Sequence, residues 1–260
     1  MTIDINAYLG AFALRDLRCN TPEALIALMD RKGIDAALVS HASAITWKDC
    51  HRANELLADE VTNESRLIPC AVLNPAYAGW ERDLNTCAHD LGMKALKLYP
   101  HWHGYALGDP CCDAIVRAAT DRGLPVVLPM RAVDSRQLGW LFDVPDLPAA
   151  DIAALARRHP TARFVVVNGI GVAGSALAPS DGEALGNCWI EISRMSLFIG
   201  CEIPRLLDNP GPERLLFGTG MPFKYVDPVL LKLEKLCAPE EAKRMIAGGS
   251  ARSLLGVAEG

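Results

Sequence analysis

The stretch Leu91–Tyr105 reads LGMKALKLYPHWHGY, and the rest of the chain is organised around it. Within it, residues 95–99 are short, apolar and flanked by turn residues, which is typical of a strand buried on both faces. Lys97 and Tyr99 lie two positions apart, so both side chains face the same side of that strand. A buried strand that ends in titratable and aromatic side chains is how a parallel α/β protein presents a functional site. We therefore expect a site at the end of this strand; in the alternative, Lys97 points outward and extends between helices.

Seven further segments have a similar buried-strand pattern, and helical signals separate them. The segments are 2–8, 35–41, 67–73, 124–130, 163–168, 187–193 and 215–219. Thr21-Pro22, for example, is a helix start, and Gly33 is a helix stop. Eight strands that alternate with helices predict an α/β fold, a distorted (β/α)8 TIM barrel, with a doubly wound open sheet as the alternative. We expect residues 1–260 to form one domain, because no linker, repeat or low-complexity run interrupts the pattern.

Composition limits the partners. The chain has 260 residues, is 50% hydrophobic and carries a formal net charge of −5 at pH 7, which argues against nucleic acid and anionic membranes. The N-terminal residues show no leader peptide pattern, and no apolar run has the length of a membrane span. The nine cysteines are scattered and form no CxxC pair, so we expect reduced thiols in a cytoplasmic protein.

The string 168–174, NGIGVAG, contains a G-x-G-x-x-G pattern after a predicted strand, and Glu191 lies on the next strand. Glycines at a helix N-terminus would allow a dinucleotide pyrophosphate to approach the backbone. The usual dinucleotide fold has this pattern at its first strand, whereas five strands precede it here. A tight strand-to-helix turn is therefore the favoured interpretation. A turn that binds a phosphate or carboxylate and an NAD-linked oxidoreductase are alternatives.

His101 and His103 have the HxH spacing of some metal sites, and on a strand both rings could reach one ion. Pro100 and Gly104 favour a loop instead, in which the histidines contact substrate or solvent. A relocated metal on His41, His101, His103 and Glu191 is a further alternative. We propose no thiol nucleophile at Cys70 or Cys201, because the sequence shows no recognisable base beside either of them.

Arg131 and Arg194 follow the fifth and seventh predicted strands, where each could bind a carboxylate with two hydrogen bonds. Glu191 and His41 stand at strand ends and are candidate acid or base groups. The alternatives are surface arginines, and for Glu191 a salt bridge between helices.

Several stretches taken together resemble the amidohydrolase superfamily, in particular its amidohydrolase-2 branch. They are ALKLYPHWHGY at 95–105, GLPVVL at 123–128, HPTARFVVVNGIG at 159–171, RLLFGTGMPF at 214–223 and IAGGSARSLL at 246–255. The resemblance implies a distorted (β/α)8 barrel of the metal-dependent-hydrolase type. It also implies hydrolysis or decarboxylation of small carboxylated compounds, usually with a metal, and a homodimer or higher homo-oligomer.

The sequence departs from that family at the metal ligands. The first-strand HxH pair is replaced by Asn6 and Tyr8, the strand-six histidine by Asn168 and the strand-eight aspartate by Gly220. The strand-five histidine position is Pro129, or Met130 if the register shifts by one residue. These residues offer neither imidazole nor carboxylate, so we predict that the standard metal is absent and that no cofactor is needed.

The predicted function is hydrolysis of a lactone, ester or cyclic amide of a small anionic, carboxylated substrate without the family's metal. Candidate substrate-binding residues are Tyr8, Lys97, Tyr99, Tyr105, Arg131, Asn168 and Arg194. Candidate catalytic residues that would move protons are His41, His101, His103 and Glu191. A catalytically inactive ligand-binding or regulatory member of the family is the alternative.

Overall fold

The computed structural model describes residues 1–140, 142 and 144–257. The strands are β1 Ile3–Leu9, β2 Ala36–His41, β3 Leu67–Pro69, β4 Ala71–Val72, β5 Leu96–Lys97, β6 Val126–Pro129, β7 Phe164–Val167, β8 Cys188–Glu191 and β9 Leu215–Leu216. The helices are α1 Pro22–Lys32, α2 Cys50–Val61, α3 Trp80–His89, α4 Pro100–His103, α5 Pro110–Asp121, α6 Ala149–Arg158, α7 Glu202–Asp208, α8 Asp227–Lys235, α9 Glu240–Arg244 and α10 Ser250–Leu255. The shorter turns are η1 Ala42–Ile45, η2 Ser135–Gln137, η3 Pro212–Arg214 and η4 Met245–Gly249. Within the described ranges, no helix combines the length and the apolar character that a bilayer crossing requires.

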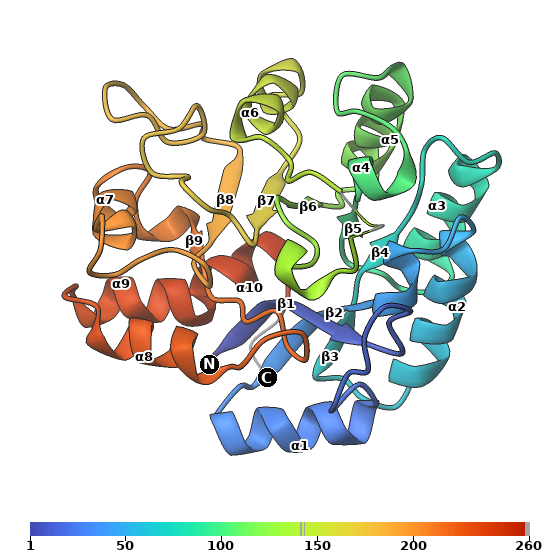
Figure 1. Ribbon diagram of the computed structural model, residues 1–260, viewed down its shortest axis with the longest axis horizontal. Helices are drawn as coiled ribbons and strands as arrows, with labels where there is room; N and C mark the ends of the chain where they lie inside the picture. Colours follow the sequence, from blue (N-terminus) through green and yellow to red (C-terminus); the bar gives the residue numbers. More distant parts are fainter. Residues whose placement is uncertain (141, 143, 258–260) are drawn as a thin grey trace.

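The strands form a parallel barrel with the helices on its outside (Figure 1). Strands β1 to β3 pair in one sheet and β4 to β9 in another, and every pairing is parallel. The expected third strand, 67–73, is divided into β3 and β4 at Cys70, whose N–H still donates to Val39 O at 2.8 Å. At the other edge, the N–H of Ile5 donates to Phe217 O at 3.0 Å, and that of Gly220 donates to Asn6 O at 2.7 Å. The fold is therefore the predicted (β/α)8 barrel, since these bonds bring its first and last strand segments together.

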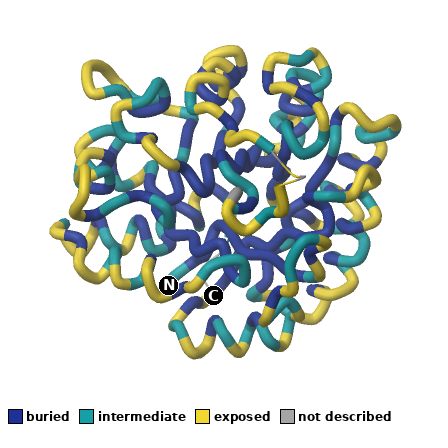
Figure 2. Tube along the Cα trace, viewed as in Figure 1, coloured by how far each residue is buried: buried dark blue, intermediate teal, exposed yellow. Residues whose placement is uncertain are grey.

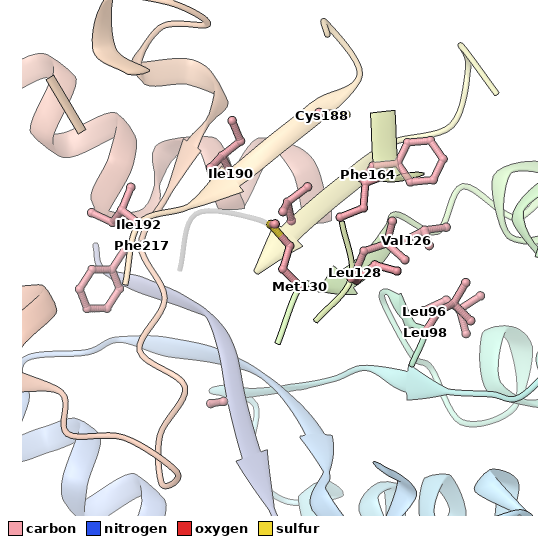
Figure 3. Close-up of a cluster of buried hydrophobic side chains, with 14 of the residues drawn as sticks. Leu96, Leu98, Val126, Leu128, Met130, Phe164, Cys188, Ile190, Ile192 and Phe217 are labelled. Carbon is pink, nitrogen blue, oxygen red and sulfur yellow. The ribbon is translucent and has the colours of Figure 1, made fainter. Parts of the chain in front are cut away.

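Both faces of the strands are buried, which explains why they read as continuous apolar runs (Figure 2). The inner cluster includes Ile5, Leu38 and Val165, together with Leu254 of α10. The outer cluster joins the strands to the helices, and Figure 3 shows part of it along β5 to β9. Because side chains alternate along a strand, Leu96 and Leu98 belong to the outer cluster and Lys97 between them faces inward.

The local helix signals act as expected. The Thr21 side chain accepts a hydrogen bond from the N–H of Ala24 at the start of α1. Gly33 ends this helix with φ +66°, in the left-handed region that glycine adopts without strain.

Two local features differ from a plain reading of the sequence. The register between β1 and β2 shifts between Asp4 and Ala7, and this bulge turns Asn6 and Tyr8 toward the barrel interior above Ile5. The expected loop after β5, the fourth barrel strand, is the short helix α4, which begins with Pro100 and ends at Gly104 with φ +76°. In a helix, residues two positions apart point in different directions, so His101 and His103 are separated.

Residues 131–148 connect β6 to α6 and are bonded to Arg15. Arg15 Nη1 donates to Gln137 Oε1 of this connection at 2.5 Å, and Arg15 Nη2 donates to Phe223 O at 2.8 Å. Positions 141 and 143 of this connection lie outside the described residues. Trp140 is 91% exposed, so its ring does not cover the barrel.

Candidate functional site

Six polar side chains meet inside the C-terminal end of the barrel, and we call this set the hub. They are contributed by β1, β2, β5 and the segments that follow β7 and β9: Asn6, Tyr8, Ser40, Lys97, Asn168 and Lys224. The hub therefore stands where barrel enzymes place their reacting groups.

Lys97 is the buried centre of the hub. Lys97 is fully buried, and its Nζ donates to Ser40 Oγ at 3.0 Å and to Asn6 Oδ1 at 3.3 Å. Nζ also lies 4.3 Å from the centre of the Tyr8 ring, a cation–π contact. Among the described residues no carboxylate forms an ion pair with Lys97, so an anion that entered the hub would find an uncompensated charge.

Asn168 connects the two lysines of the hub. Its Oδ1 accepts hydrogen bonds from Asn6 Nδ2 at 3.3 Å and from Lys224 Nζ, while its Nδ2 donates to Arg131 O at 3.0 Å. Its φ of +56° is in the left-handed region, where asparagine is one of the tolerated residues. A polar chain thus runs from Lys97 through Asn6 and Asn168 to Lys224.

Lys224 fills the space that Gly220 leaves open. A Cβ atom added at Gly220 would lie 3.1 Å from Cδ and 3.4 Å from Nζ of Lys224. Burial lowers the pKa of Lys224 to about 8, and the nearby Glu191 carboxylate acts in the opposite direction. A small increase in pH above neutrality therefore produces a substantial fraction of neutral amine at this position.

Two phenols face the hub with unused hydrogen-bonding capacity. Tyr8 and Tyr99 are 1% and 2% exposed, and neither hydroxyl has a hydrogen-bond partner among the described residues. Burial raises the pKa of Tyr99 well above its ordinary value, and its proximity to Tyr8 adds to the increase. Tyr99 therefore keeps its proton and can donate a hydrogen bond to a ligand.

The two buried carboxyl groups near the hub are already engaged. Glu191 accepts from the N–H of Asn168 at 2.8 Å and from the N–H of Ser193. Asp4 accepts from the N–H groups of Asn6 and Thr219 at 2.9 and 3.0 Å, and it bonds to Thr219 Oγ1 at 2.5 Å. Burial is the main cause that raises the pKa of Asp4 to about 7. Both groups hold the backbone in place, and each of their oxygens already accepts at least one hydrogen bond.

A cavity of about 80 Å³ opens beside Lys224 and is rich in cations. Arg131 and Arg194 line it with Lys224, as does one carboxylate, that of Asp134. Arg131 binds Asp146 through Nε and Nη2, whereas Arg194 has one ion pair among the described residues, with Asp134 at 3.6 Å. Arg194 is therefore the guanidinium that is most available to an incoming carboxylate.

Four of the predicted site residues lie neither in the hub nor at its margin. His41 is on the outward side of β2, where its ring packs against Gly10 and Nδ1 accepts from the N–H of Ser43 at 3.3 Å. His103 bonds to Ala44 O at 3.0 Å. Burial lowers the pKa of both histidines, which favours the neutral ring.

The other two of these four residues are His101 and Tyr105. His101 Nδ1 bonds to Pro145 O at 2.9 Å, and Tyr105 is buried in the outer cluster. Of the predicted set, the structure brings Tyr8, Lys97, Tyr99 and Asn168 together, with Arg131, Arg194 and Glu191 at the margin. Catalytic roles for the three histidines stay predictions.

The glycine-rich turn lacks the helix that a dinucleotide site requires. Residues 169–187 are all described and contain no helix, so no helix N-terminus stands ready for a pyrophosphate. This removes the main support for the NAD-linked alternative.

Sequence reasoning did not identify Ser40 and Lys224 as site residues. Ser40 could have been found by alternation, because it lies two positions after the inward-facing Leu38. Lys224 had a weaker signal, since it follows the predicted last strand in a segment without periodicity.

One comparison with known proteins identifies a family. The family model described as amidohydrolase matches residues 16–257. A search of curated protein sequences found no significant match.

Solved structures of similar fold cover nearly the whole chain. A 5-carboxyvanillate decarboxylase from Sphingomonas paucimobilis has a TM-score of 0.73 at 19% identity, with 99% of each chain covered. A dihydroxybenzoic acid decarboxylase from a Polaromonas species, with bound manganese and 2-nitroresorcinol, has a TM-score of 0.76 at 16% identity, with 100% of this chain and 98% of that chain covered. An uncharacterised TIM-barrel protein from Bordetella bronchiseptica has a TM-score of 0.71 at 14% identity, with 98% of both chains covered. At these identities the likeness concerns the fold alone.

The hub does not suit a divalent metal of the kind that such barrels hold. Within the described ranges, no group of three His, Cys, Asp or Glu side chains could bind an ion, and this includes the alternative set around His101 and His103. The ammonium groups of Lys97 and Lys224 instead bond to Asn6 and Asn168, two of the positions where the resemblance implies ligands. Ammonium groups have no lone pair to donate and would repel a cation.

Proposed function

The chain belongs to the amidohydrolase family, and we propose that it is an enzyme that acts on a small carboxylated substrate in the hub without a divalent ion. The observation that carries this proposal is the pair of lysine ammonium groups, Lys97 and Lys224, bonded to Asn6 and Asn168. They supply positive charge inside the barrel, and a metal ion would stabilise an anionic substrate in the same way.

The arrangement of charges indicates how the substrate binds. Its carboxylate enters the cavity beside Lys224 and pairs with Arg194, which has the weakest existing partner. The rest of the molecule extends toward Lys97 and the free hydroxyls of Tyr8 and Tyr99. A cavity of about 80 Å³ corresponds to roughly two or three water molecules, so the bound part of the substrate is small.

Two reaction classes are consistent with such a site. Hydrolysis of a lactone, ester or cyclic amide requires a base that positions water, but both buried carboxyl groups are engaged and the predicted histidines lie elsewhere. Lys224 is the remaining base candidate. Decarboxylation requires no activated water, and similar folds perform it on aromatic carboxylates. We therefore favour loss of carbon dioxide over hydrolysis.

Metal-free turnover tests this proposal directly. Purified protein, dialysed against EDTA and checked for metal content, is offered a panel of carboxylic acids, lactones, esters and cyclic amides. The proposal is supported if the protein releases carbon dioxide or opens a lactone while it contains far less than one metal ion per chain. Activity that vanishes on dialysis and returns with manganese contradicts it.

A ligand-binding protein without chemistry is the second candidate, and one observation favours it. None of the three predicted proton-transferring histidines lies in the hub, so the chain could keep the charges that hold an anion while it lacks a proton shuttle. A carboxylate that raises the melting temperature but is never consumed identifies this case.

Two observations support our proposals for the compartment and the domain organisation of the protein. All nine cysteines are free thiols, which supports our proposal of a reducing compartment such as the cytoplasm. The hub collects side chains from β1 through to the segment after β9, which supports residues 1–260 as one functional domain.

A further inference from the structure

Lys224 differs from Lys97 in what its amine can reach. Lys97 is fully buried and bonded to Ser40 and Asn6, whereas Lys224 is half-buried and lines the 80 Å³ cavity. Its Nζ has one hydrogen-bond partner among the described residues, the side-chain oxygen of Asn168. The amine is thus held in place from one side and open to the cavity on the other.

The space around Lys224 is made by the backbone. Gly220 has φ +75°, and a Cβ atom at this position would approach Cδ, Cε and Nζ of Lys224 within 3.1–3.4 Å. Phe223 lines the same cavity as Lys224, and its ring packs edge-on against Tyr8 with the ring centres 4.9 Å apart. The chain therefore fixes the direction of the lysine side chain, which reduces the entropy that a reaction at Nζ would cost.

The charged neighbours of Lys224 favour an amine that can react. The carboxyl groups of Glu191 in β8 and Asp4 in β1 stabilise the protonated form of Lys224. Burial opposes them, and so do two cations, Arg194 after β8 and Lys232 of α8. A desolvated lysine beside other cations is one of the known ways in which a protein prepares a nucleophilic amine.

We infer that Lys224 is the covalent attachment point for the substrate, a small 3-oxo acid whose carboxylate pairs with Arg194. The inference rests on the proposed function and names its substrate class. The Lys224 nitrogen forms a bond to the carbonyl carbon. The carbonyl oxygen leaves as water with one proton from the amine and one from solvent, which produces an iminium ion.

The loss of carbon dioxide then follows without a metal. The electron pair of the breaking carbon–carbon bond moves into the iminium to give an enamine, and carbon dioxide departs. Solvent supplies a proton to the enamine carbon, and water then hydrolyses the iminium to release the ketone and restore the amine. No electron acceptor is consumed, so the step balances with water and protons alone.

Reductive trapping tests the inference on the full chain. Acetoacetate, the simplest stable 3-oxo acid, is incubated with the protein, and sodium borohydride then converts any iminium into a stable amine. We expect one reduced adduct per chain, located at Lys224 by peptide mass spectrometry. Lys224→Arg, which keeps the positive charge, should lose the adduct, and Lys235→Arg at an exposed site on α8 should keep it.

A second measurement uses only the wild-type chain, so it does not depend on whether a variant folds. Schiff-base formation exchanges the carbonyl oxygen with water, so the wild-type chain should accelerate uptake of ¹⁸O from labelled water into acetoacetate. The inference is overturned if no adduct forms on Lys224, or if borohydride labels Lys235 as readily. Metal-free release of carbon dioxide that is unchanged in Lys224→Arg would overturn the inference while the proposed function stands. Trapping at Lys224 with no turnover of any carboxylate would instead remove the proposed function.

Discussion

Replacement of Asp4 by asparagine should change how stability depends on pH. The pKa of Asp4 is raised from 3.8 to about 7, mainly because the carboxyl group is buried. Between these two values the folded chain holds a proton that the unfolded chain has released. The free energy of unfolding therefore decreases as the pH rises, by about 1.4 kcal/mol per pH unit. Across the window from 3.8 to about 7 the total loss is roughly 4 kcal/mol.

The substitution Asp4→Asn should remove this loss while it preserves the hydrogen bonds. The amide oxygen can accept from the N–H groups of Asn6 and Thr219, as Asp4 Oδ1 does now. The amide nitrogen can donate to Thr219 Oγ1, which also accepts from the N–H of Met221 at 2.9 Å. The variant should thus match wild type near pH 4, gain stability relative to it as the pH rises from about 4 to about 7, and keep a constant advantage above that.

Urea unfolding at a series of pH values from about 4 to 8 measures the effect as a difference between variant and wild type. The difference removes the contributions of other titrating groups that the two chains share. Asp181→Asn, at an exposed loop position, is the control and should give a flat difference. A difference for Asp4→Asn that is equally flat would refute the reasoning, because it would mean that Asp4 is ionised in the folded chain throughout.

Four further outcomes are expected. Dialysis against EDTA should leave the melting temperature and turnover unchanged, and a decrease that manganese reverses would contradict metal independence. Arg194→Ala should weaken carboxylate binding by about 1.5–3 kcal/mol, seen as an increase in KM or Kd, since a charged hydrogen bond is lost; the exposed Arg52→Ala on α2 is its control. Lys97→Met should abolish ligand binding yet raise the urea midpoint, because a buried charge without a carboxylate partner costs stability, and an unchanged Kd would contradict its role. Formation of the borohydride adduct should increase with pH through about 8, as Lys224 loses its proton, and a pH-independent yield would exclude the amine as the nucleophile.

Much of the barrel could be predicted from the sequence because its signals are local. Strands buried on both faces are apolar along their length, and caps such as Thr21 and Gly33 act within one helical turn. Alternation also placed Lys97 and Tyr99 on the same side of their strand, and the contacts of Lys97 show that its side chain faces the barrel interior.

The exact strand limits were less accessible. The predicted strand 67–73 is divided at Cys70, and the last strand reduces to Leu215–Leu216, with the residues that follow making single bonds to β1. These limits depend on the pairing geometry between distant segments, which no local pattern contains.

For the candidate site, too, some properties could be predicted from the sequence and others depended on the tertiary structure. The sequence by itself determined which chemical groups were available: it replaced the expected imidazoles and carboxylate by Asn6, Tyr8, Asn168 and Gly220. Only the tertiary structure decided which groups meet. The bulge in β1 turns Asn6 inward, the helix at α4 separates His101 from His103, and Lys224 enters the space beside Gly220. The physical reason is that proximity across a barrel depends on register, bulges and loop paths over the whole chain, whereas side-chain chemistry is fixed residue by residue.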